Sequence, residues 1–240
     1  MHPRSRFGKR DLRPFVAAGL ARSRQSSHSL AMNRPWISAN FAISADGKIT
    51  NVVQRPSGWT SKADHARFLA LRKGADALLV GRGTLEADRM TMTVPEQDKQ
   101  PLRCVVSSKG RISLDHPLFQ TPAGPIHILA TKGAENPDLP GATFHQGSLA
   151  DFLETLATRF AVGRLHCEGG GTLLRALAEM DALDEIHLTW AGHTLFGGMQ
   201  APTITGIPGS FLPVSLEFDL VHFEPLDAEG ECFLTYRRRS

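Results

Sequence analysis

Leu78-Leu79-Val80-Gly81-Arg82-Gly83-Thr84-Leu85 and, further along, Leu165-His166-Cys167-Glu168-Gly169-Gly170-Gly171-Thr172 are two versions of one pattern. In each, an apolar run typical of a strand meets glycines and then a threonine that opens a helix. Glycine lets the backbone approach a ligand closely, and threonine caps the following helix. Because free N–H groups at a helix start attract phosphate, the two turns together predict a site that holds a dinucleotide from two sides. Two ordinary strand-to-helix corners of an α/β domain are the alternative.

The segments around these turns alternate between strand and helix patterns along residues 34–240. Strands are expected at 36–44, 75–80, 102–107, 126–130, 164–168, 184–191, 216–223 and 232–237, and helices at 61–74, 84–88, 149–160 and 172–180. This order predicts one α/β domain with a mostly parallel central sheet, an antiparallel edge and flanking helices. The strict alternation of residues 216–223 favours an exposed or edge strand.

Residues 1–33 differ in composition from the rest of the chain. Positions 1–31 hold seven lysines and arginines but one acid, Asp11, while the formal net charge of all 240 residues is only +3. The remainder is therefore mildly acidic, which argues against a nucleic-acid partner. We expect residues 1–33 to be a disordered basic tail; a mitochondrial transit peptide and a start at Met32 are the alternatives.

Composition excludes several other classes of protein. An apolar fraction of 41% suits a sizeable core, and no apolar run approaches the roughly 18 residues of a membrane span. Cys104, Cys167 and Cys232 are far apart and form no CxxC pair. Buried free thiols and a cytoplasmic location are therefore expected. Without HExxH or a Cys/His knuckle, no metal site is expected.

Neither glycine turn fits the motif of another common nucleotide-binding fold. Glu86 stands where GxGxxG requires the third glycine of the first turn, and Leu174 stands there in the second. A Rossmann fingerprint is therefore disfavoured. The chain also lacks the GxxxxGK[ST] of a P-loop and the P-C-x-x-C of a zinc deaminase.

Six short motifs follow one another along the chain: SADGKI (44–49), WTS (59–61), VGRGTLEAD (80–88), SSKG (107–110), EGGGTLL (168–174) and LFGG (195–198). In this order, over about residues 34–237, they resemble the reductase domain of bacterial riboflavin biosynthesis, the C-terminal half of the bifunctional deaminase–reductase. The resemblance implies a dihydrofolate-reductase-like fold and NADPH as cofactor. It also implies a small-molecule substrate, a ribosylamino-pyrimidine 5′-phosphate, whose ring-opened imine accepts hydride at C1′.

The resemblance assigns the reaction to Lys48, Asp88 and Glu168. A carboxylate near the imine would stabilise its positive charge. The three groups could also relay a proton if they lie together. Simpler roles remain open: Glu168 at a strand end could cap the next helix, and Asp88 could be a charge on a helix surface.

The implied binding residues form two sets. The cofactor set is Ala42, Trp59, Thr60, Gly81, Arg82, Gly83, Thr84, Ser107, Ser108, Lys109, Gly169, Gly170, Gly171, Thr172 and Leu173. Arg82 and Ser107-Ser108-Lys109 favour NADPH over NADH, because a 2′-phosphate binds cations and hydroxyls; a plain turn at Ser107–Lys109 is the alternative. The substrate set is Ser57, Arg72, Arg89 and Glu168, although Arg72 could instead be a cation at a helix C-terminus.

One departure from the family pattern concerns the substrate. The riboflavin reductases usually read ADDPxLTVR after the first glycine turn, whereas this chain reads ADRMTMTVP, with Pro95 in place of the arginine that contacts the substrate phosphate. Either Arg89 reaches that phosphate from another position, or the substrate lacks it. The leading interpretation is a 5-amino-6-(5-phosphoribosylamino)uracil reductase. The alternatives are a dihydrofolate-reductase-like oxidoreductase for another pyrimidine or pterin, and a non-catalytic nucleotide-binding module.

The C-terminal strand pattern also predicts a homodimer. Leu216, Phe218 and Leu220 share one face of the expected strand 216–223. A free apolar face of this kind is unusual on a monomer. Members of the family that this chain resembles dimerise through the same region. The alternative is that the core of the domain covers this face.

Overall fold

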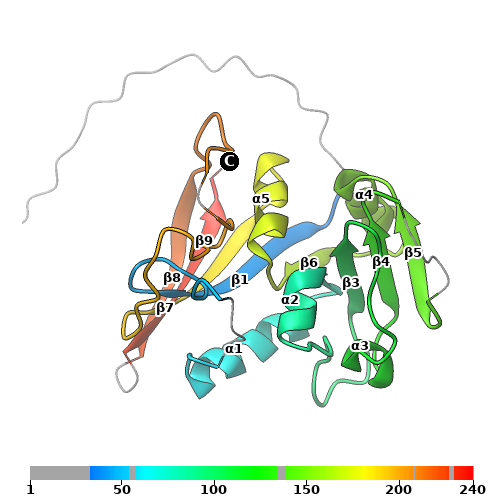
Figure 1. Cartoon of the computed structure of the whole chain (residues 1–240), viewed down its shortest axis with the longest axis horizontal. Helices are drawn as coiled ribbons and strands as arrows, with labels where there is room; N and C mark the ends of the chain where they lie inside the picture. The colour runs from blue at the N-terminus through cyan, green and yellow to red at the C-terminus, as the bar shows by residue number, and fades with distance from the viewer. Residues whose placement is uncertain (1–32, 54–57, 134–138, 208, 227–229, 240) are drawn as a thin grey trace, which may run out of the picture. The chain divides into compact units, whose positions relative to one another are not determined.

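The computed structural model describes residues 33–53, 58–133, 139–207, 209–226 and 230–239 (Figure 1). Contacts divide the chain into Met1–Ala31 and Met32–Ser240, and the described residues all belong to the second unit. The expected basic tail lies outside the described residues except for Asn33, so the domain boundary at residue 34 stays a prediction. None of the described helices is long and apolar enough to cross a membrane.

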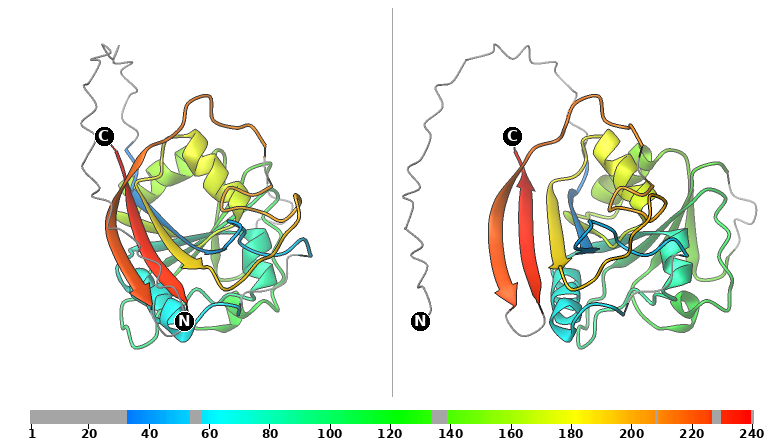
Figure 2. Two further views of the ribbon diagram at one scale, coloured as in Figure 1. Left: turned by 90° about the vertical axis from the view of Figure 1, so that its left-hand side faces the viewer. Right: turned by 60° about the vertical axis from the view of Figure 1, so that its left-hand side comes forward.

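The described strands form one nine-stranded sheet in the order β5-β4-β3-β2-β6-β1-β7-β9-β8. They are β1 (Trp36–Ser44), β2 (Ala77–Gly81), β3 (Leu102–Ser107), β4 (Ile126–Ala130), β5 (Ala142–Gln146), β6 (Arg164–Cys167), β7 (Glu185–Ala191), β8 (Phe218–Leu226) and β9 (Glu231–Arg238). Strands β1 to β7 pair in parallel, and β9 pairs antiparallel with β7 and β8. The predicted fold class is confirmed. Figure 2 shows β8 and β9 at the antiparallel edge.

Five described helices cover the two faces of the sheet: α1 (Lys62–Lys73), α2 (Arg82–Ala87), α3 (Pro117–Gln120), α4 (Leu149–Arg159) and α5 (Gly171–Glu179). On one face, α4 and α5 bury Leu156 and Leu177 in a core shared with β1, β2 and β6. On the other face, Leu85 of α2 and Leu118 of α3 join a second apolar cluster with β2, β3 and β4. Figure 1 shows α4 and α5 on the side of the sheet opposite α1 and α3.

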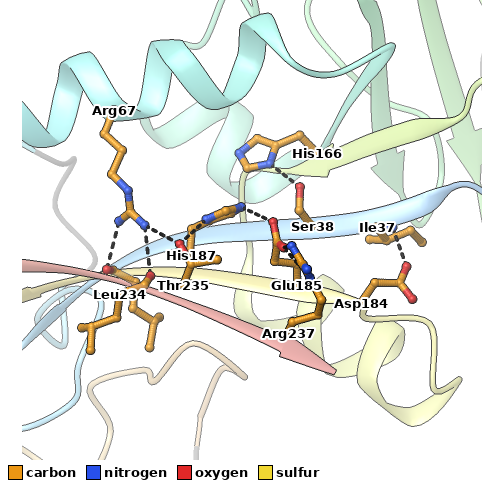
Figure 3. Close-up of polar contacts among 11 residues, drawn as sticks. Ile37, Ser38, Arg67, His166, Asp184, Glu185, His187, Leu234, Thr235 and Arg237 are labelled. Carbon is orange, nitrogen blue, oxygen red and sulfur yellow. Dashed lines mark hydrogen bonds and ion pairs between the residues drawn. The ribbon is translucent and has the colours of Figure 1, made fainter. Parts of the chain in front are cut away.

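Helix α1 lies on polar side chains of the sheet (Figure 3). Its Arg67 donates to the main-chain oxygens of Leu188 and Leu234, both at 3.0 Å. The buried polar side chains beneath it, which we call the polar layer, come from β1, β6, β7 and β9 and are Ser38, His166, Glu185, His187, Thr189, Glu231 and Thr235. Hydrogen bonds to the sheet therefore help to fix the position of α1.

The polar layer holds groups with strongly shifted pKa values. The hydrogen bond from His187, assisted by Arg237, lowers the pKa of Glu185 to about 2. Burial, together with the nearby His187, lowers the pKa of His166 to about 3. At neutral pH, Glu185 is therefore charged and His166 is neutral, with its Nδ1 2.9 Å from Ser38 Oγ.

Several local expectations were incomplete. Sequence patterns did not indicate β5 or α3, which are short elements of five and four residues. Threonine caps neither helix at the glycine turns, because Gly81 and Gly170 are the N-cap residues. Ser61 does cap α1 by accepting from Asp64 N–H at 3.0 Å. The main-chain N–H of Ser61 donates to Glu231, on β9, at 2.9 Å.

The edge strand predicted at residues 216–223 is confirmed as β8, but its side chains do not alternate regularly. Strand β8 begins at Phe218, and its register with β9 shifts between Leu220 and His222. This bulge turns Phe223 to the same face as Leu220, because an extra residue reverses the alternation. Phe218 packs against the main core. The exposed apolar face therefore includes Leu220 and Phe223 rather than Leu216 and Phe218.

Candidate active site

A cavity of about 780 Å³ lies beyond the C-terminal ends of β1, β2, β3 and β6. Ligands of open parallel sheets bind at this edge. Both glycine turns reach the cavity because β2 and β6 are neighbouring strands. Gly81 N–H donates to Gly169 O at 3.1 Å, which joins the turns directly. The predicted pair of turns is thus one continuous wall.

The second glycine turn has a conformation that requires glycine. Gly169 and Gly170 have φ values of +108° and +70°, a region that side chains disfavour. A Cβ on Gly170 would lie 3.3 Å from Thr84 Oγ1 of the first turn. No side chain caps α5. The first amides of α5 therefore lie at the cavity wall, where helix starts attract anions.

Most of the predicted cofactor residues line the cavity. They are Gly81, Arg82, Gly83, Thr84, Ser107, Ser108, Gly170, Gly171, Thr172 and Leu173. Ala42, Trp59, Thr60, Lys109 and Gly169 are outside that lining. Two of the lining side chains already have partners: Arg82 contacts Glu86 at 2.8 Å, and Ser107 Oγ accepts from Gly110 N–H at 3.0 Å. A bound phosphate would therefore compete with Glu86 for Arg82.

Glu168 forms a buried ion pair with Arg72. Arg72 Nε and Nη2 donate to the two carboxylate oxygens at 2.5 and 2.7 Å. The side chain of Glu168 is 0% exposed and that of Arg72 is 7% exposed. Burial raises the pKa of Glu168, and the contact with Arg72 opposes that rise. Arg72 also donates to Thr93 O at 2.8 Å. Arg72 does lie in the last turn of α1, as the alternative interpretation expected, but its buried ion pair with Glu168 was not predicted.

The structure brings only part of the predicted catalytic group to the cavity. Asp88, the C-cap residue of α2, lines it. Glu168 and Lys48 do not belong to the lining. Lys48 lies in the turn after β1, where its N–H donates to Ser44 Oγ at 3.0 Å. Helix α2 thus presents one carboxylate, while Arg72 covers the other.

The predicted substrate residues are dispersed. Ser57 lies outside the described residues. Arg89 is exposed, has φ +47° and is not part of the cavity lining. Sequence reasoning missed lining residues from two loops: Ile49 and Thr50 after β1, and Pro202, Gly206 and Ile207 after β7. The LFGG motif at 195–198 was the signal for the second loop, although it does not itself line the cavity.

The three cysteines are free thiols. Cys104 and Cys167 are buried free thiols, as predicted, and Cys232 is half-buried. Burial raises the pKa of Cys167 to about 12, so its thiolate is not populated at neutral pH. Within the described ranges, no group of three or more His, Cys, Asp or Glu side chains could hold a metal ion.

Comparison with known proteins places most of this chain in a protein family. The model of the RibD C-terminal domain matches residues 35–229. A 2,5-diamino-6-ribosylamino-4(3H)-pyrimidinone 5′-phosphate reductase of Archaeoglobus fulgidus is 29% identical over 193 residues, covering 71% of this chain and 86% of that protein. The chain spans about half the length of the curated RibD proteins it matches from Actinobacillus pleuropneumoniae and Bacillus amyloliquefaciens.

Solved structures share the fold. A RibD structure from Acinetobacter baumannii matches with a TM-score of 0.72 and 20% identity, covering 88% of this chain and 60% of that one. A dihydrofolate reductase from Enterococcus faecalis matches with a TM-score of 0.50 and 17% identity, covering 85% of this chain and 97% of that one. These likenesses confirm the predicted dihydrofolate-reductase-like fold.

Proposed function

This chain belongs to the RibD C-terminal domain family, and from that premise we propose that it is an NADPH-dependent reductase of riboflavin biosynthesis. Its proposed substrate is 5-amino-6-(5-phosphoribosylamino)uracil. The observation that carries the proposal is the cavity bounded by two glycine turns that hydrogen-bond to each other through Gly81 and Gly169. The archaeal relative, matched over 86% of its length, favours a second candidate substrate, the diamino-pyrimidinone 5′-phosphate of its name.

The residues at the second glycine turn fit a dinucleotide. The uncapped start of α5 at Gly171 and Thr172 would hold its pyrophosphate. Arg82, Ser107, Ser108 and the neighbouring Lys109 would hold the 2′-phosphate that distinguishes NADPH from NADH. The lack of a Cβ at Gly170, beside Thr84, leaves room for close approach of the ligand. NADPH supplies the hydride when bound.

The protein contributes charge at the reacting sugar. Asp88 at the cavity wall would stabilise the positive imine, because an opposite charge in a water-poor site favours that cation. Lys48 and Glu168 would complete the group. Arg72 binds both carboxylate oxygens of Glu168. We therefore expect Glu168 to contact the substrate only after the substrate has replaced one of these two hydrogen bonds from Arg72. That exchange is consistent with the proposed substrate roles of both residues.

The homodimer remains part of the proposal. Leu220, Phe223 and Trp190 are 52%, 54% and 45% exposed, and their cross-strand partners on β9 place them on one face of the sheet. A second copy would cover these apolar side chains. We also propose a cytoplasmic location, in keeping with the free thiols.

The test is a spectrophotometric assay of NADPH oxidation with each pyrimidine phosphate offered separately. We expect oxidation to follow substrate addition and the ribitylamino product to carry one deuterium at C1′ when the cofactor is deuterated. Oxidation with the diamino-pyrimidinone alone would select the second substrate. Tight NADPH binding without turnover of either compound would favour a non-catalytic module and overturn the proposal.

A further inference from the structure

The loop after β7, residues 193–207, forms one wall of the cavity through Pro202, Gly206 and Ile207. We call it the β7 loop. The loop is fastened to the turn after β1 by backbone bonds, Ala45 N–H to Thr194 O and Ile49 N–H to Pro202 O, both at 2.9 Å. Two charged side chains outside the cavity lining fasten it further, one near each end.

Asp46 holds the first end of the β7 loop. Its Oδ2 accepts from Gly197 N–H at 2.8 Å, and its Oδ1 accepts from Phe196 N–H at 3.3 Å and from Ser44 Oγ at 2.5 Å. These hydrogen bonds lower the pKa of Asp46, the one from Ser44 most of all. The carboxylate is therefore ionised at neutral pH and accepts from two consecutive amides of the loop.

Forming the turn after β1 does not explain this aspartate. The turn closes through main-chain bonds, Ser44 N–H to Lys48 O and Gly47 N–H to Ser44 O, both at 2.9 Å. Gly47 supplies the positive φ, +72°. The side chain of Asp46 contacts Ser44 within the turn and, outside the turn, the amides of the β7 loop. The Phe196 ring of this loop packs edge-on against Trp59, with 4.9 Å between the ring centroids.

Arg175 holds the second end of the loop. Its Nε donates to Thr205 O at 3.0 Å and its Nη2 to Ile207 O at 2.5 Å. Between these carbonyls, Gly206 is pressed onto the start of α5: a Cβ on Gly171 would lie 2.2 Å from Gly206 N. Arg175 is on the same helix, one turn beyond Gly171. The guanidinium therefore ties the loop to the helix whose first amides face the cavity.

We propose that Asp46 and Arg175 are positioning residues that hold the β7 loop against the second glycine turn and so set the width of the cofactor cleft. This inference rests on the proposed function, because it takes the start of α5 to be the pyrophosphate site. Neither residue belongs to the lining of the cavity. Their carboxylate and guanidinium act through the main chain of residues 196–197 and 205–207.

The test combines hydrogen exchange of the ligand-free protein with NADPH titration. Asp46→Ala should speed exchange at the amides of Phe196 and Gly197, and Arg175→Met should speed it at Gly206. Each variant should raise the Kd for NADPH by up to about tenfold, because the weight of the charge-assisted hydrogen bonds lost from the loop limits the effect on binding. With saturating cofactor, kcat should change less than Kd. Asp46→Asn, which keeps one acceptor oxygen, should fall between Asp46→Ala and the parent.

Matched controls lie away from the cavity. Asp76 is the residue just before β2. Like Asp46, it accepts hydrogen bonds from two consecutive amides, those of Gly163 and Arg164, at 2.9 Å each. Arg238 also bridges two partners, Asp181 and the carbonyl of Glu217. Asp76→Ala and Arg238→Met should leave the Kd for NADPH unchanged, even where they cost stability.

Unchanged exchange in the β7 loop would overturn the inference. Faster exchange with a Kd within about twofold of the parent, a difference well below one hydrogen bond, would overturn it too, since the loop would then not shape the cleft. If the parent itself does not bind NADPH, the proposed function fails instead. The exchange data would still show whether Asp46 and Arg175 hold the loop.

Discussion

Replacing Arg72 by methionine should destabilise the protein far more than a surface substitution would. The variant removes both donors from the Glu168 carboxylate and the donor to Thr93 O. It leaves a carboxylate with no exposed surface unpaired, and breaking such a buried pair typically costs about 3–5 kcal/mol. The double variant Arg72→Met/Glu168→Met should recover much of this loss, because two apolar side chains leave no charge uncompensated.

The pH dependence should identify the cause of the loss. Burial raises the pKa of Glu168, and in Arg72→Met no guanidinium opposes that rise. A carboxyl group whose pKa is raised in the folded state stabilises the fold while it is protonated, below its unfolded pKa. That stability is lost as the pH rises through the folded pKa. The deficit of Arg72→Met relative to the parent should therefore be smaller near pH 4 and larger near pH 8.

Urea unfolding of the parent and the variants at several pH values measures these differences in unfolding free energy, with one m value, the slope against urea concentration, fitted to all proteins. Thr93→Ser is a suitable control because it keeps the carbonyl that Arg72 contacts. A loss below about 1 kcal/mol for Arg72→Met, the scale of an exposed ion pair, would refute the reasoning. So would a double variant less stable than the single one, since the unpaired carboxylate would then not be the source of the loss.

Three further outcomes are expected. Gly171→Ala should lower the free energy of unfolding by about 1–3 kcal/mol, because its Cβ would lie 2.2 Å from Gly206 N. Gly83→Ala should leave the stability unchanged, because the space around Gly83 is open. Thermal unfolding of the two variants measures the difference. NADPH should bind more tightly than NADH by roughly 1.5–3 kcal/mol, the weight of one charge-assisted contact, and equal affinities by fluorescence titration would remove the 2′-phosphate site. Light scattering should give twice the 26.2 kDa chain mass, falling to a single chain on Phe223→Glu; a parent that is already monomeric would end the dimer proposal.

The sequence predicted the architecture well because its signals are local. The apolar runs of β1, β3 and β4 end at polar turns, and the bounds predicted for these strands agree with the structure. The second glycine turn carries its own conformational requirement at Gly169 and Gly170. The two turns form one wall because β2 and β6 are neighbouring strands. Short elements such as β5 have too few residues for a pattern, and the bulge in β8 leaves no mark in the alternation of Leu220 and His222.

The details of the site could not be predicted in the same way. Arg72 and Glu168 are 96 residues apart, and nothing local indicates that they pair. Asp46 reads as a turn former, although its carboxylate serves a loop 150 residues further on. The wall made by Pro202, Gly206 and Ile207 depends on tertiary contacts with α5 and the turn after β1. These long-range contacts depend on the order of the strands in the sheet. The sequence around each residue does not indicate that order.

The polar layer beneath α1 gives this helix a different response to cooling from that of α4 and α5. Exposing apolar surface raises the heat capacity and exposing polar surface lowers it, so apolar burial weakens in the cold. Helices α4 and α5 depend on such burial, whereas α1 is seated by Arg67, Arg72 and the side chains of Asp64 and Ser61. Between about 25 and 5 °C, hydrogen exchange should show the opening free energy of α1 changing less than that of α4 and α5. The Trp59 turn that leads into α1 would then keep its place at temperatures where the opposite face begins to loosen, and equal loosening of all three helices would contradict this.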